Sequence, residues 1–470
     1  MRELMKKFIE FAMGNGIVLI IGFISSPLIT RIISKEEYGK ASMFITVTSL
    51  MIVIITLGRD QGYIRYYNDE EADKRWKLLR ESIKLPLILN LILGGILIIF
   101  YKPVSNMIVQ ETSIAVVVLM ILHSTFSIIS NFALLNIRMK QKGKIYSLFQ
   151  VINKVSYLIF IVALFMIFKD SYITIVLSTI IATLVMGLSV VIYDRREWLH
   201  LKKEEHINTS NKDLLKYGTP FLFSMSIVWI FQSIDKLSLR IFSGYDEIGL
   251  YAGAMTIIAL LNIVQGTFTT FWTPVAYERY SKEPDNTKFF IEINEIVSMI
   301  MLLMSIIVIA MKDIIIIFLG AEYSGAKFIF PFLVLVPIMY TISETTVMGI
   351  NFSKNTKCHI YVAIVSAITN IIGNLILVPK YGARGAAIST GLSYIIFFIA
   401  RTYYSNKYYK VKYKLKKLWV CIIPVYILAA YSSYYEFNNV ILYLTIGGLF
   451  IVLVMYRNII ISTIKKLKKI

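Results

Sequence analysis

The sequence predicts an all-α integral membrane protein with about fourteen transmembrane helices. Hydrophobic residues make up 57% of the 470 positions, whereas an ordinary globular domain is about 45–50% apolar. The mean hydropathy is +0.68. Apolar runs of spanning length recur along the whole chain, and most Lys and Arg residues fall in alternate connections between them.

Each predicted span is an apolar run long enough to cross a bilayer as a helix, for which about 17–25 residues suffice. The connections are about 25 residues at most, too short for a soluble domain that folds alone. The fourteen predicted spans are 8–33, 41–63, 83–101, 112–136, 146–168, 171–193, 214–241, 246–273, 288–311, 327–350, 358–379, 383–404, 416–434 and 439–457.

The distribution of cations predicts the orientation, because Lys and Arg accumulate on the cytoplasmic side of membrane proteins. With the N-terminus inside, the termini and inner loops hold 36 of the 49 Lys and Arg residues and the outer loops hold 8. Both termini are therefore expected in the cytoplasm. The net charge of +20 mostly reflects the cations that orient the chain in the membrane, so no nucleic-acid partner is expected. The cations of the inner loops are expected to contact anionic lipid headgroups.

Two segments of the chain repeat one pattern, which indicates an internal duplication. Residues 27–43 read Arg-Ile-x-Ser, then acids, then Gly39, and residues 219–254 repeat this order up to Gly249 with one inserted residue. The first half starts on the cytoplasmic side, and its six spans return the chain to that side, where the second half starts. The repeats are therefore parallel, which is a common transporter design with the substrate site between the halves. The predicted organisation is a six-helix lobe 1–193, a cytoplasmic linker 194–213, a second lobe 214–404, and a basic loop with two peripheral helices, 405–470.

Three short motifs resemble one family of membrane proteins. The segment from Ala367 to Thr390 contains Asn-x3-Asn-Leu-x-Leu-x-Pro-x2-Gly-x2-Gly-Ala-Ala, residues 249–254 read Gly-Leu-Tyr-Ala-Gly-Ala, and Pro27 to Arg31 is followed by Tyr38-Gly39. These motifs are similar to those of the Wzx-type polysaccharide flippases, in the multidrug/oligosaccharidyl-lipid/polysaccharide flippase superfamily. The resemblance covers essentially the whole chain.

The resemblance implies a flippase that moves undecaprenyl-pyrophosphate-linked oligosaccharide across the bacterial cytoplasmic membrane by alternating access. It implies two six-helix lobes around a cationic cavity, and a polymerase and glycosyltransferases of the same pathway as partners. Related lipid II flippases place arginines of their first, second and eighth helices around the pyrophosphate. Arg31 and Arg59 have counterparts in that scheme, but the eighth span here has no cation before Arg279.

Charges inside spans are the candidate site residues, because a charge at membrane depth costs at least about 2.5 kcal/mol and usually serves a function. Lys236 and Arg240 lie one helical turn apart and share a face. Arg31 and Lys154 also fit interfacial residues that reach toward water, and Arg59 also fits a structural ion pair with Asp60. The candidate pyrophosphate-binding cations are Arg31, Arg59, Lys154, Lys236 and Arg240.

Acids and amides inside the second half form a second set of candidates. Asp235 and Glu344 are predicted to couple transport to an ion gradient, because a carboxyl group in an apolar setting can carry a proton. The alternative is that they are satisfied structural carboxylates. Asn370 and Asn374, four residues apart on one helix face, are predicted to be polar groups lining the cavity.

Two other functions stay open at this stage. A multidrug or cation exporter of the same fold should have an acidic cavity, whereas the spans here are richer in cations. A polysaccharide polymerase or ligase should have a catalytic outer loop, whereas the outer loops are short. The sequence carries no motif of a phosphate-binding loop, metalloprotease or serine hydrolase, so we expect no enzyme activity, no cofactor and no metal.

Overall fold

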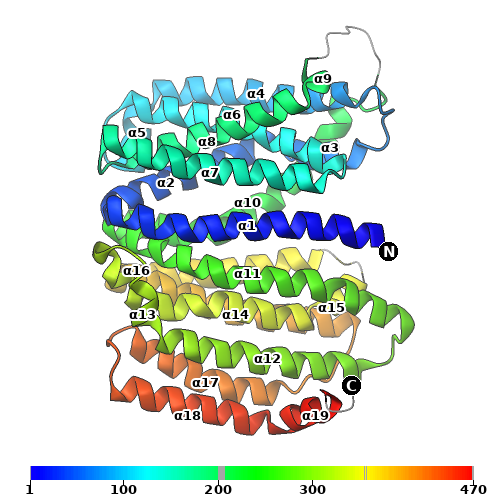
Figure 1. Ribbon diagram of the computed structural model, residues 1–470, viewed down its shortest axis with the longest axis vertical. Coiled ribbons are helices and arrows are strands. Elements are labelled where there is room, and N and C mark those ends of the chain that lie inside the picture. Colours follow the sequence, from blue (N-terminus) through cyan, green and yellow to red (C-terminus); the bar gives the residue numbers. More distant parts are fainter. Residues whose placement is uncertain (1, 200–206, 354, 356, 468–470) are drawn as a thin grey trace. The chain divides into compact units, whose positions relative to one another are not determined.

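The computed structural model describes residues 2–199, 207–353, 355 and 357–467, and this part of the chain forms helices joined by turns (Figure 1). It divides into two compact units, residues 1–230 and 231–470, so that the division falls within one long helix.

The first unit is a bundle of long helices with short helices at their ends. α7 packs against α1 and α8, and α6 packs against α4 and α8. Its core includes Phe44, Tyr63 and Phe132. The helices are α1 (Arg2–Ile32), α2 (Lys35–Thr56), α3 (Arg59–Tyr66), α4 (Arg75–Ile99), α5 (Tyr101–Val109), α6 (Ile114–Met139), α7 (Gly143–Phe168), α8 (Tyr172–Tyr193), α9 (Arg195–Trp198) and α10 (Asn211–Phe242), which continues into the second unit.

The second unit is centred on α14, which packs against α11, α12 and α16 and is buried along nearly its whole length. α17 and α18 pack against each other. The elements are α11 (Tyr245–Lys282), α12 (Thr287–Ala310), α13 (Lys312–Ile316), the 3-10 helix η1 (Ala321–Phe328), α14 (Phe330–Thr346), α15 (Met348–Phe352), α16 (Lys357–Tyr408), α17 (Leu415–Ser432), α18 (Asn439–Met455) and α19 (Arg457–Leu467).

Ten of the described helices are long and apolar enough to cross a membrane, or eleven if η1 and α14, which meet at 60°, form one bent span. The sequence predicted fourteen. The difference lies in α1, whose apolar part is the short stretch Gly16–Ile32, in α18 with 17 residues, and in α16, which is one element of 52 residues. The number of fourteen spans therefore stays a prediction.

A single glycine folds α16 back on itself. Gly382 has φ +55° and ψ −134°, outside the helical region, and a side chain there would meet the Glu247 carboxylate at 2.6 Å. Beyond this bend the Ser389 hydroxyl donates to the Asn370 carbonyl oxygen at 2.9 Å. The two halves of α16 therefore lie side by side, and the run of small residues after Gly382 permits that close approach.

The two units share one local device. In the first unit the Glu37 carboxylate accepts a hydrogen bond at 2.7 Å from the backbone N–H of Tyr172, the first residue of α8. In the second unit the Glu247 carboxylate accepts one at 2.7 Å from the N–H of Ala383, at the start of the second half of α16. Both acids lie in the first turn of their own helix, where the helix dipole favours negative charge. Each unit thus uses a Glu at the start of one helix to hold the start of another.

Candidate functional site

The second unit contains a carboxylate that is buried among neutral polar groups. Asp235, in the last part of α10, is 3% exposed. It accepts hydrogen bonds from the Tyr251 hydroxyl at 2.5 Å and the Thr390 hydroxyl at 2.7 Å. The side-chain amides of Asn374 and Asn370 donate to it at 2.8 and 3.2 Å. Four neutral donors from α11 and both halves of α16 therefore converge on one acid.

The geometry of α16 builds this Asp235 cluster. Asn370 and Asn374 are four residues apart on a helix, which places both on one face. The bend at Gly382 returns the chain so that Thr390 and Ser389 lie opposite them; the Ser389 hydroxyl also donates to Asn370 Oδ1 at 2.7 Å. The Oδ1 atom of Asn374 is buried and has no hydrogen-bond partner within the described structure. The cluster thus retains a free oxygen beside the carboxylate.

The chemistry of the Asp235 cluster suits a small positive charge. Its oxygen atoms come from a carboxylate, two amides and three hydroxyl groups, all withdrawn from water. A carboxylate buried in a membrane bundle is costly unless its charge is compensated, and such groups mark ion and proton pathways. The cluster has the composition to hold a proton or a monovalent cation.

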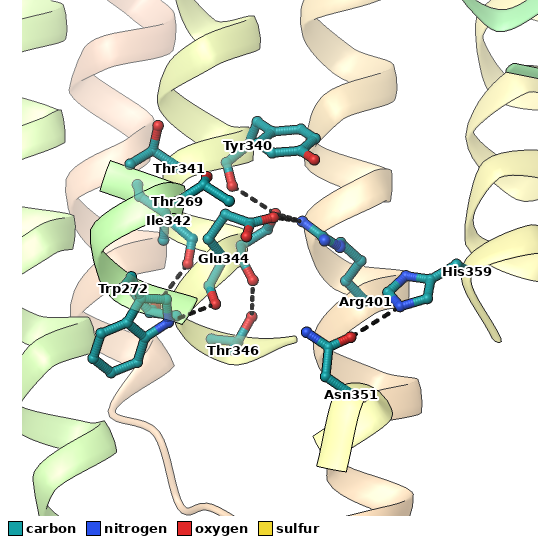
Figure 2. A network of polar contacts seen from close by, with 12 residues as sticks. Thr269, Trp272, Tyr340, Thr341, Ile342, Glu344, Thr346, Asn351, His359 and Arg401 are labelled. Carbon is teal, nitrogen blue, oxygen red and sulfur yellow. Dashed lines mark hydrogen bonds and ion pairs between the residues drawn. The ribbon is translucent and has the colours of Figure 1, made fainter. Parts of the chain in front are cut away.

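A second buried carboxylate in the same unit has a different partner. Glu344 is 5% exposed and Arg401 6%, and Arg401 Nη1 lies 2.7 Å from Glu344 Oε1 (Figure 2). The same nitrogen donates to the Ser343 hydroxyl at 2.7 Å. The Arg401 guanidinium carbon lies 5.0 Å from the ring centres of both Tyr340 and Phe397. The pair joins α14 to the second half of α16.

The Glu344 backbone is also held in place. The Trp272 indole N–H donates to the Glu344 carbonyl oxygen at 3.0 Å. Figure 2 shows that His359 and Asn351 lie beside Arg401, where His359 Nε2 and Asn351 Oδ1 are 3.0 Å apart. The ion pair is thus the centre of a network that ties α11, α14 and α16 together. Its two formal charges cancel inside the bundle.

Lys236 and Arg240 follow Asp235 along α10, and both are half-buried. The guanidinium carbon of Arg240 lies 5.0 Å from the centre of the Tyr245 ring, a cation–π contact at the turn between α10 and α11. Among the residues that the sequence predicted for the site, the structure brings Asp235, Asn370 and Asn374 into one cluster. Glu344 belongs to a separate network.

The three candidate cations of the first unit lie in different surroundings. Arg31 is exposed in the last turn of α1, and Lys154 is half-buried in α7. Arg59 is 1% exposed and begins α3. Its Nη2 atom donates to the Glu81 carbonyl oxygen at 2.7 Å and to the Asn211 side chain at 2.5 Å.

Sequence reasoning missed Arg401. It lies within the predicted span 383–404 but is not among the candidate cations, and in the structure it is buried inside α16. Its position near the end of the predicted span 383–404 hid it, because hydropathy does not distinguish an interfacial cation from a buried, paired one. The available signal was Glu344, a buried acid that required a cationic partner. Tyr251, Thr390 and Ser389 were also missed, since hydroxyl groups are common in membrane helices.

Comparison with known proteins places this architecture. The polysaccharide biosynthesis protein family matches residues 4–280, more than half of the chain. The chain belongs to that family. An uncharacterized membrane protein of Methanocaldococcus jannaschii is 23% identical, with 92% of this chain and 91% of that protein aligned. The probable low-salt glycan biosynthesis flippase Agl15 of Haloferax volcanii is 21% identical over 54% of this chain and 52% of its own length.

Solved structures share the fold of this family member. The lipid II flippase MurJ in its inward closed conformation is similar over 98% of this chain and 99% of its own, with a TM-score of 0.73 and 17% identity. An inward-facing multidrug resistance MATE transporter is similar over 83% of this chain and 93% of its own, with a TM-score of 0.54 and 15% identity. Both likenesses concern the fold.

Proposed function

We propose that this protein is a flippase that moves a lipid-linked oligosaccharide across the cytoplasmic membrane for the synthesis of a surface polysaccharide. The observation that carries the proposal is the family match over residues 4–280. It is supported by the name of Agl15 as a probable glycan biosynthesis flippase and by a fold similar to that of a lipid II flippase along the whole chain.

The proposed substrate is a glycan attached through pyrophosphate to a polyprenol, undecaprenol in a bacterium. A pyrophosphate in a low-dielectric path needs cationic donors, and the forked guanidinium of arginine is especially suited to it. Arg31, Arg59, Lys154, Lys236 and Arg240 are the proposed donors. Arg31 is the strongest of them in the first unit, because its side chain is exposed, whereas that of Arg59 is engaged with Glu81 and Asn211.

The proposed architecture has fourteen spans with both termini in the cytoplasm. Two parallel six-helix lobes, 1–193 and 214–404, are joined by the linker 194–213 and followed by two further helices in 405–470. The matching Glu37 and Glu247 contacts support the duplication. Rocking of the lobes would alternate access to the two sides. The two relatives named above are archaeal, so the bacterial location rests on the motif resemblance alone.

The proposed energy coupling uses Asp235 in preference to Glu344. Asp235 accepts its hydrogen bonds from neutral donors and so can gain a proton or a monovalent cation. Glu344 already has Arg401 as its counter-ion. Asn370 and Asn374 would then serve as ligands or donors beside Asp235. The polymerase and glycosyltransferases of the same pathway are the proposed partners.

The test is the leaflet in which the lipid-linked glycan accumulates when cells are depleted of this protein. We expect accumulation on the cytoplasmic side, rescued by the wild type but not by Arg31→Ala or by Lys236→Ala/Arg240→Ala. Lys282→Ala, which removes an exposed cation paired with Glu278, is the matched control and should rescue. Rescue by both test variants would remove the cationic site from the proposal. If the depleted cells show lipid-linked glycan in the outer leaflet at the normal level but leave it unpolymerised, the result would contradict a transport function and favour a polymerase function for this protein.

A multidrug exporter is the second candidate, since the MATE structures share the fold. Family membership favours the glycan. Export of an organic cation by the purified protein, without movement of lipid-linked glycan, would reverse that preference.

A further inference from the structure

The first unit contains a pocket of about 220 Å³ between α2, α6 and α10. Its wall includes Thr56 and Asp60 on one side, Asn131 and Phe132 of α6 on another, and Met225 of α10. None of the candidate cations lines it. The pocket is therefore distinct from the cationic groups proposed for the pyrophosphate.

One polar group in this Asp60 pocket is unsatisfied. Asp60 Oδ2 accepts a hydrogen bond from the Gln61 side chain at 2.7 Å, but Asp60 Oδ1 is buried and has no hydrogen-bond partner among the described residues. A buried carboxylate oxygen without a donor is costly, and each such group in a folded protein needs an explanation. A ligand that donates hydrogen bonds in the pocket would supply the missing partner.

The backbone fixes Asp60 at this position. Leu57 and Gly58 have φ of +52° and +66°. These two non-helical residues end α2, and α3 begins directly after them at Arg59. A side chain at Gly58 would meet the Gly218 carbonyl oxygen at 2.2 Å. Glycine at this position therefore allows the break to lie directly against α10. Asp60 then falls in the first turn of α3. The neighbouring Arg59 guanidinium is directed to Glu81 and Asn211.

The rest of the wall is amphipathic. Asn131 is exposed on α6, and its amide carries both a donor and an acceptor. Leu135 and Met225, which are half-buried, add apolar side chains to the wall. A sugar ring has the same two-sided character, with hydroxyl groups at its edge and an apolar C–H face.

We propose that the Asp60 pocket binds one sugar unit of the transported glycan, a refinement that rests on the proposed flippase function. Hydroxyl groups of the sugar donate to Asp60 Oδ1 and exchange hydrogen bonds with Asn131, and the C–H face lies on the half-buried side chains of Leu135 and Met225. The pocket is smaller than the ~300–1,000 Å³ of drug-sized sites, which favours a monosaccharide over a large organic cation. The carboxylate excludes the pyrophosphate.

The test measures, by saturation-transfer NMR, the binding of small probes to the purified full-length protein in nanodiscs. The probes are methyl glycosides of glucose, galactose and N-acetylglucosamine, with rhodamine 6G as the organic cation. We expect at least one glycoside to bind the wild type, and Asp60→Asn to weaken that binding at least tenfold. Asn131→Trp, which fills the pocket from an exposed position, should do the same without changing the charge. Asp69→Asn, at an exposed acid paired with Arg65, is the control and should bind normally.

The outcomes separate this proposal from the flippase function. Absence of glycoside binding, or binding that neither variant changes, overturns the sugar pocket. Asp60-dependent binding of rhodamine 6G alone assigns the pocket to an organic cation and also overturns it. A wild type that binds a glycoside through Asp60 but never moves lipid-linked glycan overturns the flippase function and leaves the pocket in place.

Discussion

The second unit contains two buried carboxylates that differ in how their charge is balanced. Asp235 is 3% exposed and accepts hydrogen bonds from two hydroxyl groups and two amides. Glu344 is 5% exposed and lies 2.7 Å from the Arg401 guanidinium. Both carboxylates contact side chains of α16. Similar burial therefore coexists with two different electrostatic solutions.

The difference separates a fixed element from an adjustable one. A buried ion pair with good geometry is neutral as a unit, and removing either partner leaves an uncompensated charge. A carboxylate held by neutral donors keeps its charge, which a proton or small cation can neutralise. The Glu344–Arg401 pair therefore fits a structural role, and the Asp235 cluster fits the proposed coupling site.

The largest effect is expected from breaking the ion pair. Arg401→Met leaves Glu344 buried without a cation, and we expect a loss of about 3–5 kcal/mol in the free energy of unfolding. Thermal unfolding of the purified protein in detergent measures it. The double variant Glu344→Gln/Arg401→Met removes both charges and should recover most of that loss. A double variant as unstable as the single one would contradict the structural role of the pair.

A smaller stability effect and a larger transport effect are expected at Asp235. Asp235→Asn keeps the shape of the side chain but weakens its hydrogen bonds, for a loss of about 1–3 kcal/mol. The rate of glycan movement in vesicles should then no longer respond to an imposed proton or sodium gradient. The measurement compares initial rates with and without each gradient. If Glu344→Gln abolishes the response and Asp235→Asn preserves it, the assignment of the two acids is reversed.

The smallest effect is expected at an exposed ion pair of the same unit, Lys327 with Glu436 at 2.5 Å. The hydrogen bond from Lys327 lowers the pKa of Glu436 below its ordinary value. The stability that the ion pair contributes is therefore complete above the pKa of Glu436 in the unfolded chain, about 4.3. It disappears as the pH falls through the lower pKa of Glu436 in the folded protein. Glu436→Gln should leave the melting temperature nearly unchanged at pH 7, because exposed pairs contribute little. A large change there would mean that burial does not set the scale of these effects.

Composition and periodicity predicted the all-helical membrane architecture, because a bilayer demands long apolar helices whatever their packing. The same reasoning placed Asn370 and Asn374 on one helix face. It did not predict that both would donate to Asp235, since that contact joins α10 to a segment of α16 far away in the sequence. Contacts between distant segments have no local signature.

Arg401 shows a second limit of sequence reasoning. A cation close to the end of an apolar run looks the same whether it reaches the interface or turns inward to an acid. Only the position of Glu344 on the neighbouring α14 distinguishes the two cases. The Asp60 pocket shows a third limit, because it depends on two consecutive residues with positive φ, Leu57 and Gly58, of which only glycine favours that conformation.

The most direct test of the flippase proposal uses the purified protein in vesicles that contain a fluorescent polyprenyl-pyrophosphate-linked glycan. A glycosidase added outside cleaves only the glycans in the outer leaflet, so continued cleavage beyond that fraction reports movement. We predict continued cleavage with the wild type, loss of it with Arg31→Ala, and none in protein-free vesicles. Cleavage that stops at the outer-leaflet fraction with correctly folded wild-type protein, under every imposed gradient, would contradict the proposal that this family member is a lipid-linked glycan flippase.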